Sequence, residues 1–241
     1  MAPTTSAHIG ILSPATPNRP HFKSLDGILP AGVSITHEGL GLLGESYRDL
    51  VGKTDRIVEL AKDFVKRHPV RGLMLTGGFV TLFNPGLESR VVDAVDLPVA
   101  SAVASAVAAL KAYRAQTVLL MTPFDAASDR VIQNHLNQLG FRVDLGPAIE
   151  NRKAGSAVNL TRDELFALAA KTFKAKSPAD AIYFQGATMD PLPVIQRLES
   201  ELSIPVITSN TAMLWQLLSN LGLNYSVRGY GKLLADWPAS N

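Results

Sequence analysis

The chain alternates short apolar runs with longer stretches in which apolar residues recur every three or four positions. Residues 54–68 show the second pattern, with an apolar face from Ile57 to Val65 that ends before Pro69. Continuous apolar runs are typical of strands buried on both faces. Strands that alternate with helices at these lengths predict largely parallel sheets.

These patterns predict strands at 8–13, 33–36, within 71–80, and at 97–100, 117–122, 141–145, 181–185 and 205–208. They predict helices at 54–68, 85–94, 101–113, 126–139, 161–174, 191–202 and 209–221. Thr161 and Glu164 have capping-box spacing. Asn84-Pro85 and Asp190-Pro191 are each typical of an N-cap followed by proline. Residues 14–30 and 146–160 are long polar connections, which are often functional.

The landmarks of the first half of the chain recur in the second half in the same order. The paired positions are Pro14 and Pro123, Gly77 and Gly186, Pro85 and Pro191, and Pro98 and Pro205, at spacings of 109, 109, 106 and 107. Such recurrence predicts two structurally similar halves. We therefore expect an α/β protein with two pseudo-symmetric Rossmann-like halves, each a mainly parallel sheet flanked by helices. The first half is residues 1–115 plus the returning segment 209–241, and the second is residues 116–208.

Small polar residues, glycine and proline follow several of the predicted strands. The short motifs concerned are Ser13-Pro14, Thr76-Gly77-Gly78, Thr122-Pro123 and Gln185-Gly186-Ala187-Thr188. Ligands of open parallel sheets bind beyond the carboxyl ends of the strands, where backbone amides and hydroxyls suit a carboxylate or phosphate. A glycine pair can also serve only as a tight strand-to-helix connection. Neither the dinucleotide-binding motif nor the P-loop motif occurs, which argues against a nucleotide ligand. We therefore favour a small carboxylate in the cleft between the halves.

Composition narrows the function classes. The net charge of +2 comes from 23 basic and 21 acidic residues without a basic block, so neither nucleic acid nor a membrane is an expected partner. Zero cysteines exclude disulfides, thiolate metal sites and thiol catalysis. The five histidines lack metal-ligand spacing, so the residues themselves do not indicate a metal site. With no export or membrane-spanning pattern, we expect a cytoplasmic protein that is a possible homo-oligomer.

Five stretches together carry a family resemblance. They are IGILSP near the start, EGLGLLGESY before the first long helix, LTGGFV, the segment from DAIYFQGATMDP to TSNTAMLW, and RGYGKLL near the end. In this order the chain resembles the aspartate/glutamate racemase superfamily, and within it the branch of arylmalonate decarboxylase and maleate isomerase. The resemblance covers nearly the whole chain. It implies an active site between two pseudo-symmetric halves and cofactor-free, metal-free chemistry on small mono- or dicarboxylates.

The chain departs from this family at the cysteines. The family normally has a cysteine at the end of the strand before the glycine turn in one half, in the other half, or in both, as acid, base or nucleophile. Here the first position is Thr76 or Gly77, and the second is Gln185 or Gly186. Two-thiol racemisation and isomerisation through a cysteine adduct therefore do not carry over to this chain.

The resemblance still implies a carboxylate-binding site formed by residues of both halves. Tyr47 matches a family tyrosine near the pocket, and a second family tyrosine falls at Phe124, so one hydroxyl donor is missing. We expect catalytic roles for Thr76, Tyr47 and Gln185. The expected substrate contacts are Pro14, Gly77, Gly78, Thr122, Phe124, Gly186, Ala187 and Thr188.

Two kinds of function remain open from the sequence. One is a decarboxylase-like enzyme that stabilises an enediolate with backbone amides and hydroxyls and takes its proton from Thr76, Thr122, Tyr47, Asp125 or a bound water. Asp125 can instead cap the following helix. The other is an isomerase or racemase-type homologue with non-cysteine chemistry, or a carboxylate-binding protein without turnover.

Overall fold

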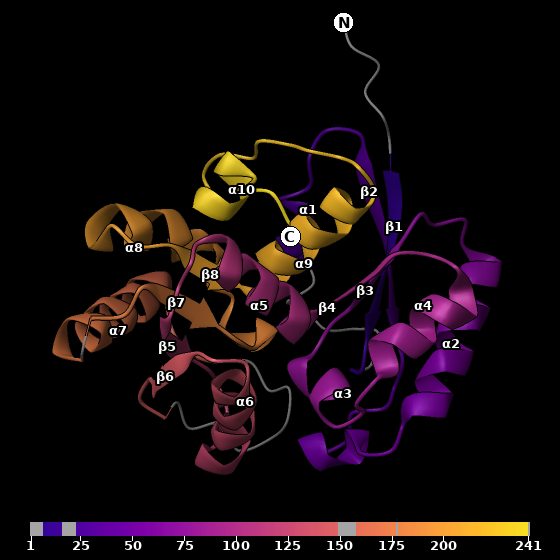
Figure 1. Cartoon of the computed structure of the whole chain (residues 1–241), viewed down its shortest axis with the longest axis horizontal. Helices are drawn as coiled ribbons and strands as arrows, with labels where there is room; N and C mark the ends of the chain where they lie inside the picture. Colours follow the sequence, from indigo (N-terminus) through magenta and orange to yellow (C-terminus); the bar gives the residue numbers. More distant parts are fainter. Residues whose placement is uncertain (1–6, 16–22, 149–157, 177, 241) are drawn as a thin grey trace, which may run out of the picture.

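The structure is a computed structural model that describes residues 7–15, 23–148, 158–176 and 178–240. Two four-stranded parallel sheets form its framework (Figure 1). The first has the order β2-β1-β3-β4, with β1 (Ala7–Ser13), β2 (Val33–Gly39), β3 (Leu73–Leu75) and β4 (Val99–Ser101). The second has the equivalent order β6-β5-β7-β8, with β5 (Thr117–Met121), β6 (Arg142–Leu145), β7 (Ala181–Phe184) and β8 (Val206–Thr208). The two similar α/β halves expected from the repeat are confirmed.

Helices connect the strands in each half. The first half contains α1 (Lys23–Asp26), η2 (Tyr47–Leu50), α2 (Thr54–Arg67), α3 (Gly78–Leu82), α4 (Leu87–Val95) and α5 (Ala102–Ala112). The later part of the chain contains α6 (Ala126–Gln138), α7 (Arg162–Ala175), η3 (Ala187–Met189), η4 (Leu192–Val194), α8 (Ile195–Leu202), α9 (Ser209–Asn220) and α10 (Lys232–Asp236).

The helices α5 and α9 pack against each other between the two sheets (Figure 1). Each continues directly from the last strand of its sheet, α5 from β4 and α9 from β8. Because α9 also contacts β3 and β4, it joins the two sheets through one shared core. Trp215 of α9 is fully buried there and donates its indole N–H to the carbonyl oxygen of Pro238 at 2.9 Å. The limits of the two halves, 1–115 plus 209–241 and 116–208, stay a prediction.

The strand pairings fix which residues of the two halves are equivalent. Leu12 pairs with Leu75 in the first sheet, and Met121 pairs with Phe184 in the second. The backbone N–H of Thr76 donates to Leu12 at 3.0 Å, and that of Gln185 donates to Met121 at the same distance. Thr76 and Gln185 are therefore equivalent, and so are the glycines that follow them.

Two predicted helix starts are wrong. The N-cap of α4 is Gly86, whose φ of 76° is left-handed, while the Asn84 side chain turns inward and bonds the segment before α2. Asp190 is also left-handed, with a φ of 41°, and ends η3. The chain then passes through η4 before α8 begins at Ile195, so Pro191 does not open one continuous helix.

Other local predictions hold within the described residues. The capping box of Thr161 and Glu164 is present at the start of α7, and Asp125 caps α6 by accepting from the Ser128 N–H at 2.8 Å. The strand expected at 33–36 continues to Gly39 because β2 pairs with β1 over its whole length. The connections 14–30 and 146–160 lie partly outside the described residues.

Candidate functional site

The carboxyl ends of the strands in both sheets open into one cavity of about 840 Å³, its open mouth included. The predicted catalytic residues Thr76, Tyr47 and Gln185 all line it. So do the predicted contact residues Pro14, Gly77, Gly78, Phe124, Gly186, Ala187 and Thr188. The structure thus brings together ten of the eleven predicted site residues. Thr122 does not line this cavity.

The two glycine corners that follow β3 and β7 have similar backbone geometry, with a positive φ and nearly equal ψ. Gly77 has a φ of 84° and a ψ of 107°, and Gly186 has a φ of 119° and a ψ of 108°. A Cβ on Gly77 would lie 3.0 Å from Pro14, and one on Gly186 would lie 2.6 Å from Pro123. Glycine is required in both corners because of the positive φ and because the proline that follows the neighbouring strand lies against it. The repeated spacing seen in the sequence follows from this shared packing.

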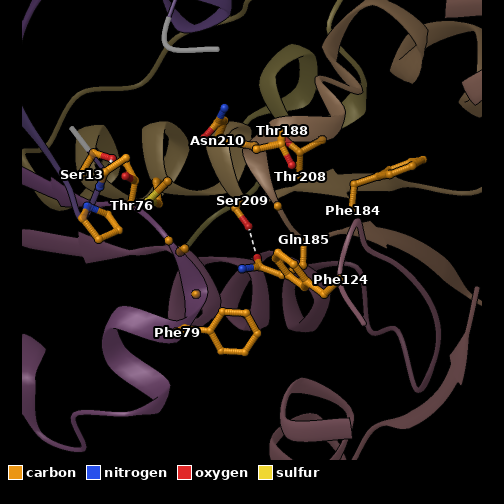
Figure 2. Close-up of a pocket in the computed structure, with 18 of the residues that line it drawn as sticks. Ser13, Thr76, Phe79, Phe124, Phe184, Gln185, Thr188, Thr208, Ser209 and Asn210 are labelled. Atoms are coloured by element: carbon orange, nitrogen blue, oxygen red, sulfur yellow. Dashed lines mark hydrogen bonds between the residues drawn. The ribbon is translucent and has the colours of Figure 1, made fainter. Parts of the chain in front are cut away.

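Gln185 lies in the second corner and is 1% exposed. Its Oε1 accepts from the Tyr183 hydroxyl at 2.5 Å and from the Ser209 hydroxyl. Figure 2 shows the amide oxygen joined to Ser209, which begins α9. On the other side, a Cβ built on Gly78 would lie 2.1 Å from Gln185 Nε2, so the amide nitrogen reaches across the cleft to the first corner.

Three aromatic rings from separate segments form one wall of the cavity. The ring centroids of Tyr47 and Phe79 are 4.7 Å apart, and Phe124 lies 5.0 Å from each of them. Tyr47 comes from η2, Phe79 from α3, and Phe124 from the segment after β5. Ring separations of this size are typical of favourable aromatic contacts. The wall therefore couples the first half of the molecule to the second.

The threonine hydroxyls that follow β3 and β5 have partners within the protein. Thr76 Oγ1 donates to the Leu12 carbonyl oxygen at 3.4 Å. Thr122 Oγ1 donates to the Asp129 carboxyl group and accepts the Phe124 N–H at 3.2 Å, which explains why Thr122 points away from the cavity. Thr188 Oγ1 is buried and has no hydrogen-bond partner among the described residues.

The family model of arylmalonate decarboxylase matches residues 11–234 of this sequence. The chain belongs to the arylmalonate decarboxylase family. Maleate isomerase of Nocardia farcinica (strain IFM 10152) is 29% identical over 165 residues, which are 64% of this chain and 65% of the isomerase. The match therefore spans less than two thirds of that relative's length.

Two solved structures share the fold of this arylmalonate decarboxylase family member. Unliganded arylmalonate decarboxylase superposes with a TM-score of 0.80 at 20% identity, covering 95% of this chain and 99% of that chain. A cysteine-to-serine variant of Nocardia farcinica maleate cis-trans isomerase, with a covalently bound succinylcysteine intermediate, gives 0.82 at 21% identity, covering 95% and 98%. The resemblance and the fold class expected from the sequence are confirmed.

This member of the arylmalonate decarboxylase family differs from that isomerase in its cysteine content. The sequence contains no cysteine, so a succinylcysteine intermediate cannot form on it. At the ends of β3 and β7 it has Thr76 and Gln185. The polar side chains among the described lining residues are hydroxyls and carboxamides, such as Ser13, Thr208 and Asn210.

Two further observations concern charged groups and helices. Asp129 is 6% exposed, and desolvation raises its pKa to about 6, although the Thr122 hydrogen bond acts in the opposite direction.

Among the described residues, no group of three or more His, Cys, Asp or Glu could hold a metal ion. Every described helix is too short or too polar to cross a membrane. The cytoplasmic location and the homo-oligomer stay predictions.

Sequence reasoning missed Phe79 and Tyr183. Tyr183 lies two positions before Gln185, and residues two apart on a strand share a face, which is the signal that could have placed its hydroxyl beside the Gln185 amide. Phe79 follows the glycine pair directly, but only the position of α3 shows that its ring reaches Phe124. Ser209 and Asn210, at the start of α9, also line the cavity.

Proposed function

We propose that the cavity is the active site of a cofactor-independent decarboxylase that acts on a small mono- or dicarboxylate. The observation that carries this proposal is that two equivalent glycine corners, one from each sheet, open into the same cavity. Oriented backbone amides, hydroxyls and the Gln185 carboxamide would meet a carboxylate there. Membership of the arylmalonate decarboxylase family supports this reaction class.

The reaction is that of a malonate-type acid. The retained carboxylate is held by the neutral donors, and the departing carboxylate lies against the apolar wall of Tyr47, Phe79 and Phe124. The bond between the α-carbon and the departing carboxylate breaks, and carbon dioxide leaves. The electron pair passes into the retained carboxylate as an enediolate, which the oriented donors stabilise. The α-carbon then takes a proton from water, which gives the monocarboxylate product.

We assign three residues to this site. Gln185 contacts the retained carboxylate through its amide N–H groups. Thr76 and Tyr47 line the site on the side of the first half. Tyr47 contributes its hydroxyl, and the Thr76 hydroxyl would exchange its 3.4 Å bond to the Leu12 carbonyl oxygen for a bond to the ligand. Because threonine and tyrosine hydroxyls are weak acids near neutral pH, water is the proton source in this scheme.

A second candidate is a carboxylate-binding protein without turnover. The specific observation in its favour is that the residue ending β7 is Gln185, and a carboxamide does not transfer protons near neutral pH. Carboxylate binding by the same neutral donors would be common to both candidates. The two therefore differ only in product formation.

The test incubates the protein with phenylmalonate, malonate and maleate. Carbon dioxide release and NMR in D₂O, which reports deuterium at the product α-carbon, measure turnover, and calorimetry measures binding. We expect decarboxylation of at least one malonate, and Tyr47→Phe should lower its rate by about 10- to 100-fold. Tyr230→Phe, outside the cavity, is the matched control. Binding without product formation would establish the second candidate, and neither binding nor turnover would overturn both.

A further inference from the structure

We propose that the side-chain amide of Gln185 is the principal carboxylate donor of the cleft, and that Tyr183 and Ser209 are positioning residues that turn its N–H groups toward the cavity. This inference rests on the carboxylate site proposed above. It assigns carboxylate binding to the Gln185 side chain after β7, and orientation of that side chain to two hydroxyl groups that contact it.

The orientation of the amide follows from its hydrogen bonds. A carboxamide oxygen accepts two hydrogen bonds, and its nitrogen donates two. The Tyr183 hydroxyl lies 2.5 Å from Gln185 Oε1, and the Ser209 hydroxyl donates to the same oxygen. The two hydroxyls are 3.1 Å apart, so they form a pair on one side of the amide. With both lone pairs of Oε1 engaged, the nitrogen must lie on the opposite side.

The Tyr183 hydroxyl is suited to this task. Tyr183 is fully buried, and desolvation raises the pKa of its phenol above the ordinary range, although the Ser209 hydrogen bond acts in the opposite direction. The phenol therefore stays protonated at physiological pH and remains a donor to Gln185. Ser209, at the first position of α9, is 8% exposed. Both positioning hydroxyls are thus shielded from bulk water.

The nitrogen side of the amide faces the cavity. Gln185 is 1% exposed and lines the cavity, yet its Nε2 donates no hydrogen bond within the described part of the chain. Nε2 is not among the fully buried polar atoms that lack a partner, so this donor is open to the cavity. Figure 2 shows the amide between Ser209 and Phe124, in the middle of the labelled side chains. A ligand carboxylate would supply the acceptors that the protein itself leaves open.

Gly78 provides the space for this nitrogen. A Cβ on Gly78 would lie 2.1 Å from Nε2, far closer than any real contact. The φ of Gly78 is outside the left-handed region, so backbone conformation does not require glycine there. The absence of a side chain instead lets the amide of the second half reach the first glycine corner. A carboxylate bound to Gln185 would therefore sit between the two corners.

The test measures the dissociation constants of malonate, phenylmalonate and maleate by calorimetry. Gln185→Leu should weaken binding of the ligand that the parent protein binds by about 10- to 100-fold, because donors to a charged acceptor are lost. Gln185→Glu should weaken it more, because a carboxylate then faces the ligand. Gln196→Leu, the same change on an exposed face of α8, should leave the affinity unchanged.

The positioning residues are tested by a double-mutant cycle. Tyr183→Phe and Ser209→Ala should each weaken binding by about 3- to 20-fold in the parent protein, and neither should do so in the Gln185→Leu background. Tyr113→Phe is the control for Tyr183→Phe, because it removes a buried hydroxyl that has no partner among the described residues. A purely structural role would lower the melting temperature without this coupling.

The outcomes separate this inference from the proposed function. Parent-like affinity in Gln185→Leu, or equal effects of the positioning variants in both backgrounds, would overturn the inference while leaving the carboxylate site intact. Absence of binding by the parent protein to every acid would overturn both. Losses of affinity in Tyr183→Phe and Ser209→Ala that disappear in the Gln185→Leu background would support both the inference and the proposed carboxylate site.

Discussion

The Gln185 side chain occupies the space beside Gly78. This contact decides whether Gly78→Ala raises or lowers the free energy of unfolding. Alanine is ordinarily better than glycine in a helix by about 1 kcal/mol. At Gly78, the first residue of α3, the added Cβ would meet Gln185 Nε2 at 2.1 Å and Val103 at 3.0 Å. The steric cost of overpacking, about 1–3 kcal/mol, exceeds the helical gain.

We therefore expect Gly78→Ala to lower the free energy of unfolding, measured by urea denaturation. In a Gln185→Ser background the same change should cost less, because the shorter side chain vacates the space beside Gly78. Equal costs in the two backgrounds would show that Val103, and not the amide, limits the space.

Asp129 gives a prediction on pH dependence. Desolvation raises the pKa of its carboxyl group to about 6 in the folded protein, against an ordinary value of 3.8. The folded state therefore holds the proton more tightly than the unfolded state does. The resulting stabilisation is complete below pH 3.8 and is lost as the pH rises through 6.

Between about pH 4 and pH 7, the free energy of unfolding of the parent protein should fall relative to that of Asp129→Asn, by at most about 3 kcal/mol. Urea denaturation of both proteins across this range measures the difference. Parallel pH curves would show that the Thr122 hydrogen bond compensates for the burial of the carboxyl group.

At the scale of elements, Asn84 joins three segments, of which η2 and α3 line the cavity. Its Nδ2 donates to the carbonyl oxygens of Leu50 and Val80, both at 2.8 Å. Its Oδ1 accepts from the Lys53 N–H at 2.7 Å and from the Thr54 hydroxyl at 3.2 Å. The amide thereby connects the end of η2 and the start of α2 to α3.

Asn84→Ala should lower the free energy of unfolding by about 2–4 kcal/mol, because it leaves several buried polar groups without partners. It should also weaken carboxylate binding, since Tyr47 belongs to η2. Asn220→Ala, at the exposed end of α9, should change stability by less than about 0.5 kcal/mol. Loss of stability with unchanged binding would show that η2 keeps its place without Asn84.

Asn84 also marks the limit of what could be predicted from the sequence at this scale. Periodicity and apolar runs located the strands and long helices, because they depend on burial within one element. The N-cap assignments at Asn84 and Asp190 failed, because the partners of these residues depend on the tertiary structure. The same limit hid α3, a five-residue helix whose place depends on the glycine corner before it.

For the whole molecule, the repeat spacing of 109 residues was sufficient to predict two facing halves. In each half, a proline and a glycine pack together at the ends of neighbouring strands. The two halves therefore share this spacing although most of their other residues differ. It could not reveal the asymmetry between the corners. Thr76 directs its hydroxyl to its own sheet, whereas Gln185 reaches across to Gly78, and only three-dimensional contacts distinguish these arrangements.

The two halves should unfold together despite their separate sheets. One cluster of buried apolar residues extends from Ala7 to Trp237, and α5 packs against both α9 and β8. Phe124 of the second half adds contacts to Phe79 and Tyr47 of the first. Because neither half can separate without exposing this shared core, a locally folded half gains little over the fully unfolded chain.

Differential scanning calorimetry should therefore give one transition with equal calorimetric and van't Hoff enthalpies. Tryptophan fluorescence, which reports the buried Trp215 in α9 together with Trp237, should change at the same temperature. Phe124→Ala should shift this transition downward, by about 3–5 kcal/mol in unfolding free energy, without splitting it. Two resolved transitions in the parent protein would mean that the sheets fold independently, and that the cleft between them is held by weaker contacts than the α5 and α9 packing implies.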